Sequence, residues 1–193
     1  LPFIFRHEIS LPPPYRFFKT NPKLKKYWEL KLNKEKKIKI GIIWQGDNLN
    51  HKMDFKRSVP LKILQPILEL KEIKFVSLQK DFGREQIRLN KFENLITDFY
   101  GNIDQKPFED TLSIIECLDI VISVDTSIAH IAATMNKNTW IIIPHVPDFR
   151  WGLKGQKTIW YDNVKLYRQK KINNWNNVIN DLKKDLIKKY NLK

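Results

Sequence analysis

From residue 38 onward, short apolar runs alternate with longer segments in which apolar residues recur at helical spacing. The runs are rich in Ile and Val, which is typical of strands buried on both faces. The predicted strands are 38–44, 73–79, 95–99, 119–124, 139–144 and 164–167, and the predicted helices are 59–70, 84–91, 108–118, 127–135 and 174–190. This alternation predicts an α/β fold, a Rossmann-like, doubly wound parallel sheet of about six strands.

Residues 1–36 have a different pattern. Successive prolines at 12–14 favour an extended segment, and a helix is expected over 22–33. We interpret 1–36 as a connector and 37–193 as one Rossmann-like domain. The apolar face of the 22–33 helix suggests contact with a missing domain or a neighbouring molecule. Because the chain begins at Leu1, we expect it to be a piece of a longer protein.

Composition narrows the class of protein. The single cysteine, Cys117, excludes an internal disulfide framework, and a cytoplasmic setting is expected. No apolar run of about 18 residues or signal-peptide pattern is recognisable. The net charge of +14 is spread over surface helices and both termini, which argues against nucleic acid as a partner. Phosphorylated ligands or an anionic membrane surface fit this charge equally well, so a peripheral position at the inner membrane is compatible with it.

The most informative segment is 120–133, where a buried strand turns at once into a helix of small residues. A helix N-terminus at the carboxyl end of a parallel strand favours an anion, because free N–H groups and the helix dipole both point there. His130 follows Thr126 by one helical turn and can share its face. We therefore predict a site for an anionic, phosphorylated small molecule at Asp125, Thr126, Ser127 and His130. The alternative is an ordinary N-cap facing water and a structural histidine.

Further candidates come from the loops after the other strands, where such sheets bind ligands. A glycine permits a tight turn, cations can reach a phosphate, and a long aromatic loop can close over a ligand. The candidates are Gln45, Gly46, Lys52 and Arg57 after the first strand, Gln79 and Lys80 after the second, and Arg150 and Trp151 after the fifth. The alternatives are a polar surface loop with chance charges, and aromatic residues (Trp151, Trp160, Tyr161) that cover the sheet edge.

Several signatures of other functions do not occur in the sequence. It has no G-x-G-x-x-G after the first strand, no phosphate-binding G-x-x-x-x-G-K-[ST] and no G-x-S-x-G. Cys/His spacing typical of metal sites and an Asp-x-Asp pair do not occur either. We therefore expect no metal and no cofactor, and we assign no catalytic residue.

A set of motifs makes the prediction more specific. The motifs are Asp125-Thr-Ser-x-x-His130-x-Ala-Ala, Asp148-x-Arg150-Trp151, Trp160-Tyr161 and Arg168-Gln169. Together they resemble the C-terminal donor-binding half of GT-B glycosyltransferases. The similarity is closest to ADP-heptose:lipopolysaccharide heptosyltransferases and to bacterial glycosyltransferases linked to tetratricopeptide repeats. The latter also have segments similar to Gly41-Ile-Ile-Trp44-Gln-Gly46 and Phe75-Val-Ser-Leu-Gln79. The resemblance covers roughly residues 37–183.

The resemblance implies a nucleotide-diphosphate sugar as donor and metal-independent hexosyl or heptosyl transfer to a glycan, lipid or protein. In the family the diphosphate rests on the turn matching 125–127, which makes Lys52, Arg57, Gln79, Lys80 and His130 its candidate partners. The general base and acceptor site of heptosyltransferases come from an N-terminal half that residues 1–36 cannot build. A missing N-terminal domain or a helical-repeat region is therefore an expected partner. The alternatives are a degenerate, non-catalytic module and another GT-B nucleotide-sugar enzyme such as an epimerase.

Overall fold

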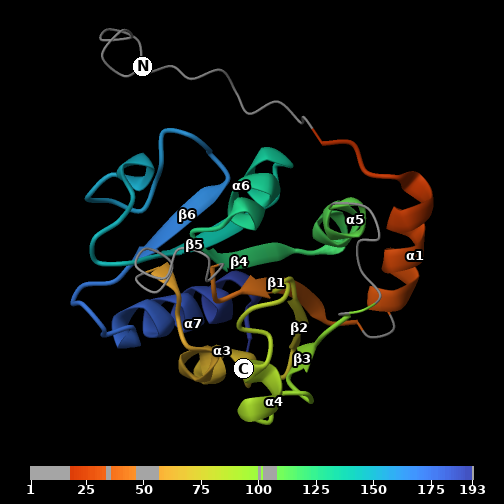
Figure 1. Ribbon diagram of the computed structural model, residues 1–193, viewed down its shortest axis with the longest axis horizontal. Helices are drawn as coiled ribbons and strands as arrows, with labels where there is room; N and C mark the ends of the chain where they lie inside the picture. Colours follow the sequence, from red (N-terminus) through yellow and green to blue (C-terminus); the bar gives the residue numbers. More distant parts are fainter. Residues whose placement is uncertain (1–17, 34–35, 47–56, 100, 102–107, 193) are drawn as a thin grey trace, which may run out of the picture.

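The computed structural model describes residues 18–33, 36–46, 57–99, 101 and 108–192. Their centre is a six-stranded, fully parallel sheet in the order β3-β2-β1-β4-β5-β6 (Figure 1). The strands are β1 (Ile38–Ile43), β2 (Ile73–Ser77), β3 (Ile96–Thr97), β4 (Ile120–Val124), β5 (Thr139–Ile143) and β6 (Val164–Arg168). The predicted Rossmann-like sheet is confirmed, and its strand order reverses between β1 and β4, where such folds bind ligands.

Helices cover both faces of the sheet (Figure 1). One face carries α1 (Pro22–Leu32), α5 (Glu109–Cys117) and α6 (Ser127–Thr134). The other carries η1 (Leu61–Leu64), α3 (Gln65–Leu68), α4 (Gln86–Leu89) and α7 (Asn176–Tyr190), while η2 (Phe149–Trp151) lies between β5 and β6. The helix predicted over 59–70 is divided into η1 and α3. Pro66 lies in the first turn of α3 and has no N–H to continue an α-helix from the preceding turn.

The two central strands, β1 and β4, show why apolar residues and a glycine occupy these positions. β1 pairs with β4 in the register Ile40↔Ile120 and Ile42↔Ile122, and all four of these side chains are buried. Gly41 lies between them, where a Cβ atom would come within 2.5 Å of Leu118 Cδ1. The absence of a side chain at Gly41 therefore allows the helical layer to approach the centre of the sheet closely.

Helix α1 packs against α5 of the same chain. Trp28 and Leu32 are fully buried, and Trp28 Nε1 donates a hydrogen bond to Asp110 Oδ1 over 2.7 Å. The Trp28 ring also meets the ring of Phe99 edge-on, with 5.0 Å between centroids. The expectation that this helix face contacts a missing domain or a neighbour is therefore wrong, because α5 already covers it. The prolines at 12–14 lie outside the described residues.

None of the helices in the described part of the chain is both long and apolar enough to cross a membrane.

Candidate functional site

The turn between β4 and α6 lies at the carboxyl edge of the sheet. Thr126 occupies the N-cap position in an extended conformation, yet no side chain of the described residues caps the helix. Its hydroxyl instead lies 3.0 Å from the Ser123 hydroxyl, which donates to the Val124 carbonyl. Hydrogen bonding within the helix begins with the amide of Ala129, which donates to Thr126 O. The amides of Ser127 and Ile128 precede that bond and point out of the helix end.

A cleft of about 400 Å³ opens in front of this helix end. Side chains from the ends of β1 and β2 and from the start of α6 enclose it. It is lined by Ile43, Gln45, Gly46, Arg57, Leu78, Gln79, Lys80, Asp81, Phe82, Phe108, Thr126, Ser127 and Ile128. The structure thus brings together seven of the residues selected from the sequence: Gln45, Gly46, Arg57, Gln79, Lys80, Thr126 and Ser127. Lys52 lies outside the described residues.

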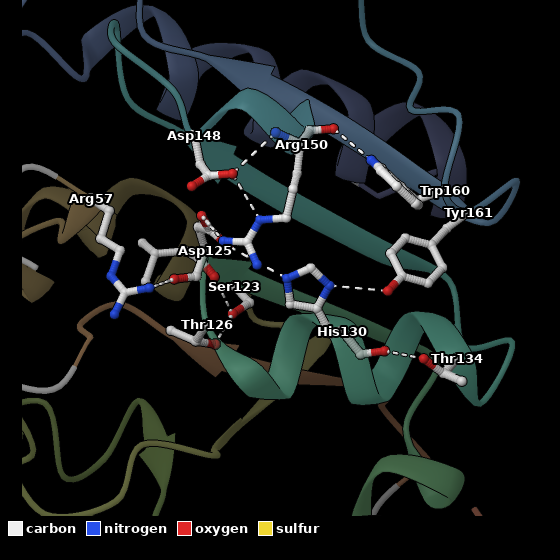
Figure 2. Close-up of polar contacts among 11 residues, drawn as sticks. Arg57, Ser123, Asp125, Thr126, His130, Thr134, Asp148, Arg150, Trp160 and Tyr161 are labelled. Carbon is white, nitrogen blue, oxygen red and sulfur yellow. Dashed lines mark hydrogen bonds and ion pairs between the residues drawn. The ribbon is translucent and has the colours of Figure 1, made fainter. Parts of the chain in front are cut away.

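Arg57 gives the cleft a cation directly beside the helix end (Figure 2). Its Nη1 donates to the backbone carbonyl of Asp125 over 2.6 Å, which fixes the guanidinium next to the turn. Lys80, after β2, is exposed and also lines the cleft. A positive helix end flanked by cations is an arrangement that attracts a phosphate or diphosphate.

Gln79 holds the cleft walls together. The side chain is only 8% exposed, and its Oε1 accepts hydrogen bonds from the backbone amides of Trp44 and Gln45. Its Nε2 donates to the carbonyl oxygens of Gln45 and Phe82 over 3.0 and 2.8 Å. The carboxamide thereby joins the loops that follow β1 and β2, so Gln79 determines the shape of the cleft.

Asp125, His130, Arg150 and Trp151 form a separate cluster behind the turn and do not line the cleft. The buried Asp125 carboxylate lies 3.6 Å from Arg150 Nη2 and 3.7 Å from His130 Nε2 (Figure 2). His130 Nδ1 lies 3.0 Å from the Tyr161 hydroxyl, and its ring stacks on Trp151 with 5.2 Å between centroids. His130 therefore faces the segment between β5 and β6, although helical spacing from Thr126 had placed it toward the anion.

The charge state of this cluster follows from its neighbours. Burial by itself would raise the pKa of Asp125, but the contacts with His130 and the charge of Arg150 outweigh it. The pKa of Asp125 is therefore lower than its ordinary value, and the carboxylate is ionised at neutral pH. An ionised Asp125 can hold the Arg150 guanidinium and so connects the α6 turn to the segment between β5 and β6.

That segment is tightly held. The Arg168 guanidinium donates to the carbonyl oxygens of Trp151, Gly152 and Gly155, and Trp160 Nε1 donates to Arg150 O over 2.9 Å. Trp151 is buried, and Tyr161 packs against the same small core cluster under α6. The structural interpretation of the aromatic residues as cover for the sheet edge is confirmed for these two.

Among the lining residues that the sequence analysis did not select are two phenylalanines. Phe82 and Phe108 each expose about two fifths of their surface at its wall. Phe108 precedes α5 with φ = 63°, a left-handed conformation that a bulky residue rarely adopts. Phe82 follows the predicted strand 73–79, and Phe108 is the first residue of the predicted helix 108–118, so only their position beside strand and helix ends could have identified them.

No family model and no curated protein matches this sequence. Solved structures do. The structure of E. coli ADP-heptose lps heptosyltransferase II aligns with a TM-score of 0.60 at 12% identity, over 90% of this chain and 54% of that one. E. coli heptosyltransferase WaaC with ADP aligns with a TM-score of 0.53 at 14% identity, over 86% of this chain and 47% of that one. E. coli heptosyltransferase WaaC with ADP-2-deoxy-2-fluoro heptose aligns with a TM-score of 0.50 at 12% identity, over 86% of this chain and 46% of that one.

These alignments confirm the fold expected from the motifs. The chain has the Rossmann-like architecture of one half of a GT-B heptosyltransferase and is similar in fold to these enzymes. It spans about half the length of the structures that it matches.

Proposed function

We propose that this chain is the donor-binding domain of a metal-independent glycosyltransferase and holds a nucleotide-diphosphate sugar in the cleft before α6. The observation that carries the proposal is the uncapped N-terminus of α6, which opens on the cleft with Arg57 beside it. Two of the solved structures with the same fold are described as holding ADP or ADP-2-deoxy-2-fluoro heptose.

The chemistry of the cleft suits a diphosphate leaving group. Negative charge grows on the diphosphate as the bond to the sugar breaks, and prearranged donors stabilise that charge without reorganisation. Here the donors are the first amides of α6 and the Arg57 guanidinium, and Lys80 also lines the cleft. The rings of Phe82 and Phe108 offer apolar surface for a nucleobase. Hexosyl or heptosyl transfer then needs an acceptor site and a general base, which we assign to a further domain or a helical-repeat region.

The first test is a thermal-shift panel with ADP, UDP and GDP, with the matching nucleosides as controls. A ligand at a hundred times its dissociation constant adds about 2.7 kcal/mol to the free energy of unfolding, so a diphosphate that binds raises Tm clearly. The nucleosides should raise Tm less. If none of the diphosphates changes Tm, the chain is better described as a degenerate binding module.

A backbone substitution tests the helix end directly. Ser127 is the first residue of α6, where proline fits a helix, and Thr126 before it is already extended, as a residue preceding proline prefers. Ser127→Pro therefore removes one N–H donor and keeps the helix. We expect it to weaken ADP binding about tenfold in calorimetry, the cost of about one charge-assisted hydrogen bond.

Ser127→Ala is the matched control, because it removes the hydroxyl and keeps the amide. Equal affinities in the two variants would contradict a role for the helix N-terminus.

A further inference from the structure

We propose that the segment between β5 and β6 docks the protein on an anionic lipid surface. Four large apolar side chains of this segment are exposed: Phe149 by 80%, Leu153 by 82%, Ile159 by 61% and Trp160 by 38%. We call them the apolar loop surface. The segment runs beyond β6 at the margin of the sheet (Figure 1). Single exposed apolar residues are ordinary, but four within twelve residues of one segment are the observation from which we infer an interaction surface.

The backbone under this surface is held in place. Arg168 binds the carbonyl oxygens of Gly152 and Gly155, and Leu166 N donates to Gln156 O over 2.8 Å. The segment also turns Trp151 inward, leaving it 2% exposed, while Phe149 and Leu153 on either side point out. The outward side chains are therefore presented by an ordered loop, so little conformational entropy is lost when they insert.

The charge of the segment between β5 and β6 indicates which kind of partner its exposed apolar residues would bind. Lys154 and Lys157 lie between Leu153 and Ile159 in the sequence, and Lys170 and Lys171 follow β6; all four are exposed. Residues 144–172 contain seven Lys or Arg and two Asp, a net charge of +5. Of the two acids, Asp148 is paired with Arg150 over 2.8 Å. Arg150 and Lys165 are paired with Asp148 and Asp185, so it is the four exposed lysines that complement anionic headgroups.

Because lysines are mixed with the exposed apolar residues, a lipid surface is a better partner for this segment than another protein. The centres of protein interfaces are depleted of lysine, because burying its charge against another protein is costly. At a membrane the same side chains extend to the headgroups, while Phe, Leu and Trp enter the boundary with the acyl chains. The indole N–H of Trp160 already donates to Arg150 O, which removes the cost of burying that donor in lipid.

Vesicle flotation tests this proposal. The full chain is mixed with vesicles of phosphatidylcholine alone or of phosphatidylcholine with phosphatidylglycerol. We expect binding to the mixed vesicles that weakens as salt is added. The double variant Phe149→Ser/Leu153→Ser should lower the partition coefficient at least about tenfold, since two large apolar groups no longer enter the membrane. The variant Lys154→Gln/Lys157→Gln should lower it about fivefold per lysine removed.

The matched control is Leu89→Ser, which changes an equally exposed leucine (70%) on α4. It should bind vesicles as the unsubstituted chain does. No binding to the mixed vesicles, or a loss that is the same for Leu89→Ser as for the loop variants, would overturn the proposal. Capture of a protein partner by the apolar loop surface without any vesicle binding would also overturn it. Nucleotide-induced thermal shifts are read separately, so failure here is distinguishable from failure of the proposed function.

Discussion

The two sides of the β4–α6 turn use similar residues for different purposes. On the cleft side, Arg57 and the first amides of α6 face an open space of about 400 Å³. On the other side, Arg150 and His130 face Asp125, Tyr161 and Trp151 within the fold. The difference teaches that the contacts a cation or histidine makes within the fold decide whether it lies at the cleft, as Arg57 does, or turns to the interior, as Arg150 and His130 do. Substitutions on the two sides should therefore have separable effects, on stability and on binding.

The largest effect is expected from Trp151→Ala. Trp151 is 2% exposed and stacks on His130, so its truncation leaves a cavity under α6. We expect a loss of about 3–5 kcal/mol in the free energy of unfolding, measured by urea denaturation. Trp160→Ala removes a half-exposed tryptophan of the same segment and should cost far less. Similar losses in the two variants would mean that Trp151 is not the anchor of this segment.

Asp125→Asn should destabilise the protein by about 2 kcal/mol at neutral pH, because Arg150 and His130 lose their buried carboxylate partner. The effect depends on pH. The pKa of Asp125 is lowered in the folded state, so the stabilisation is present above the pKa of the unfolded chain, about 4, and is lost as pH falls through the folded value.

Urea titrations of both proteins between neutral and acidic pH measure this effect. Plotted against pH, the free energies of unfolding of Asp125→Asn and of the unsubstituted chain should converge below about pH 4. A difference in stability that stays constant over this range would show that the carboxylate charge is not what holds the cluster.

Arg57→Gln should have the smallest effect on stability and a specific one on binding. It removes the donor to Asp125 O and the cation beside the helix end, and we expect at least about a tenfold loss of ADP affinity with less than about 1 kcal/mol of destabilisation. Arg88→Gln, on the exposed side of α4, is the matched control and should change neither quantity. Equal ADP affinities in these two variants would move the ligand site away from Arg57.

The sequence predicted the strands well because their burial on both faces requires continuous Ile and Val runs. It also placed the cleft, since parallel strands bring their carboxyl ends to one edge. It did not predict which partner each side chain would find. The apolar face of the 22–33 helix was recognised, but its cover, α5, is more than 70 residues further along the chain. Gln79 was selected for a ligand and does line the cleft, but the sequence did not show that its carboxamide also joins two loops.

The sequence alone determined the α/β alternation, the strand-to-helix turn at 125–127 and the helical spacing of His130, because all of these depend on neighbours within a few residues. Only the tertiary structure decided that Arg57 reaches the cleft and that His130 and Arg150 turn to Asp125 and the segment after β5. The physical reason is that side-chain partners are chosen by packing and charge compensation between segments far apart in the chain. Local periodicity carries no information about those distant contacts.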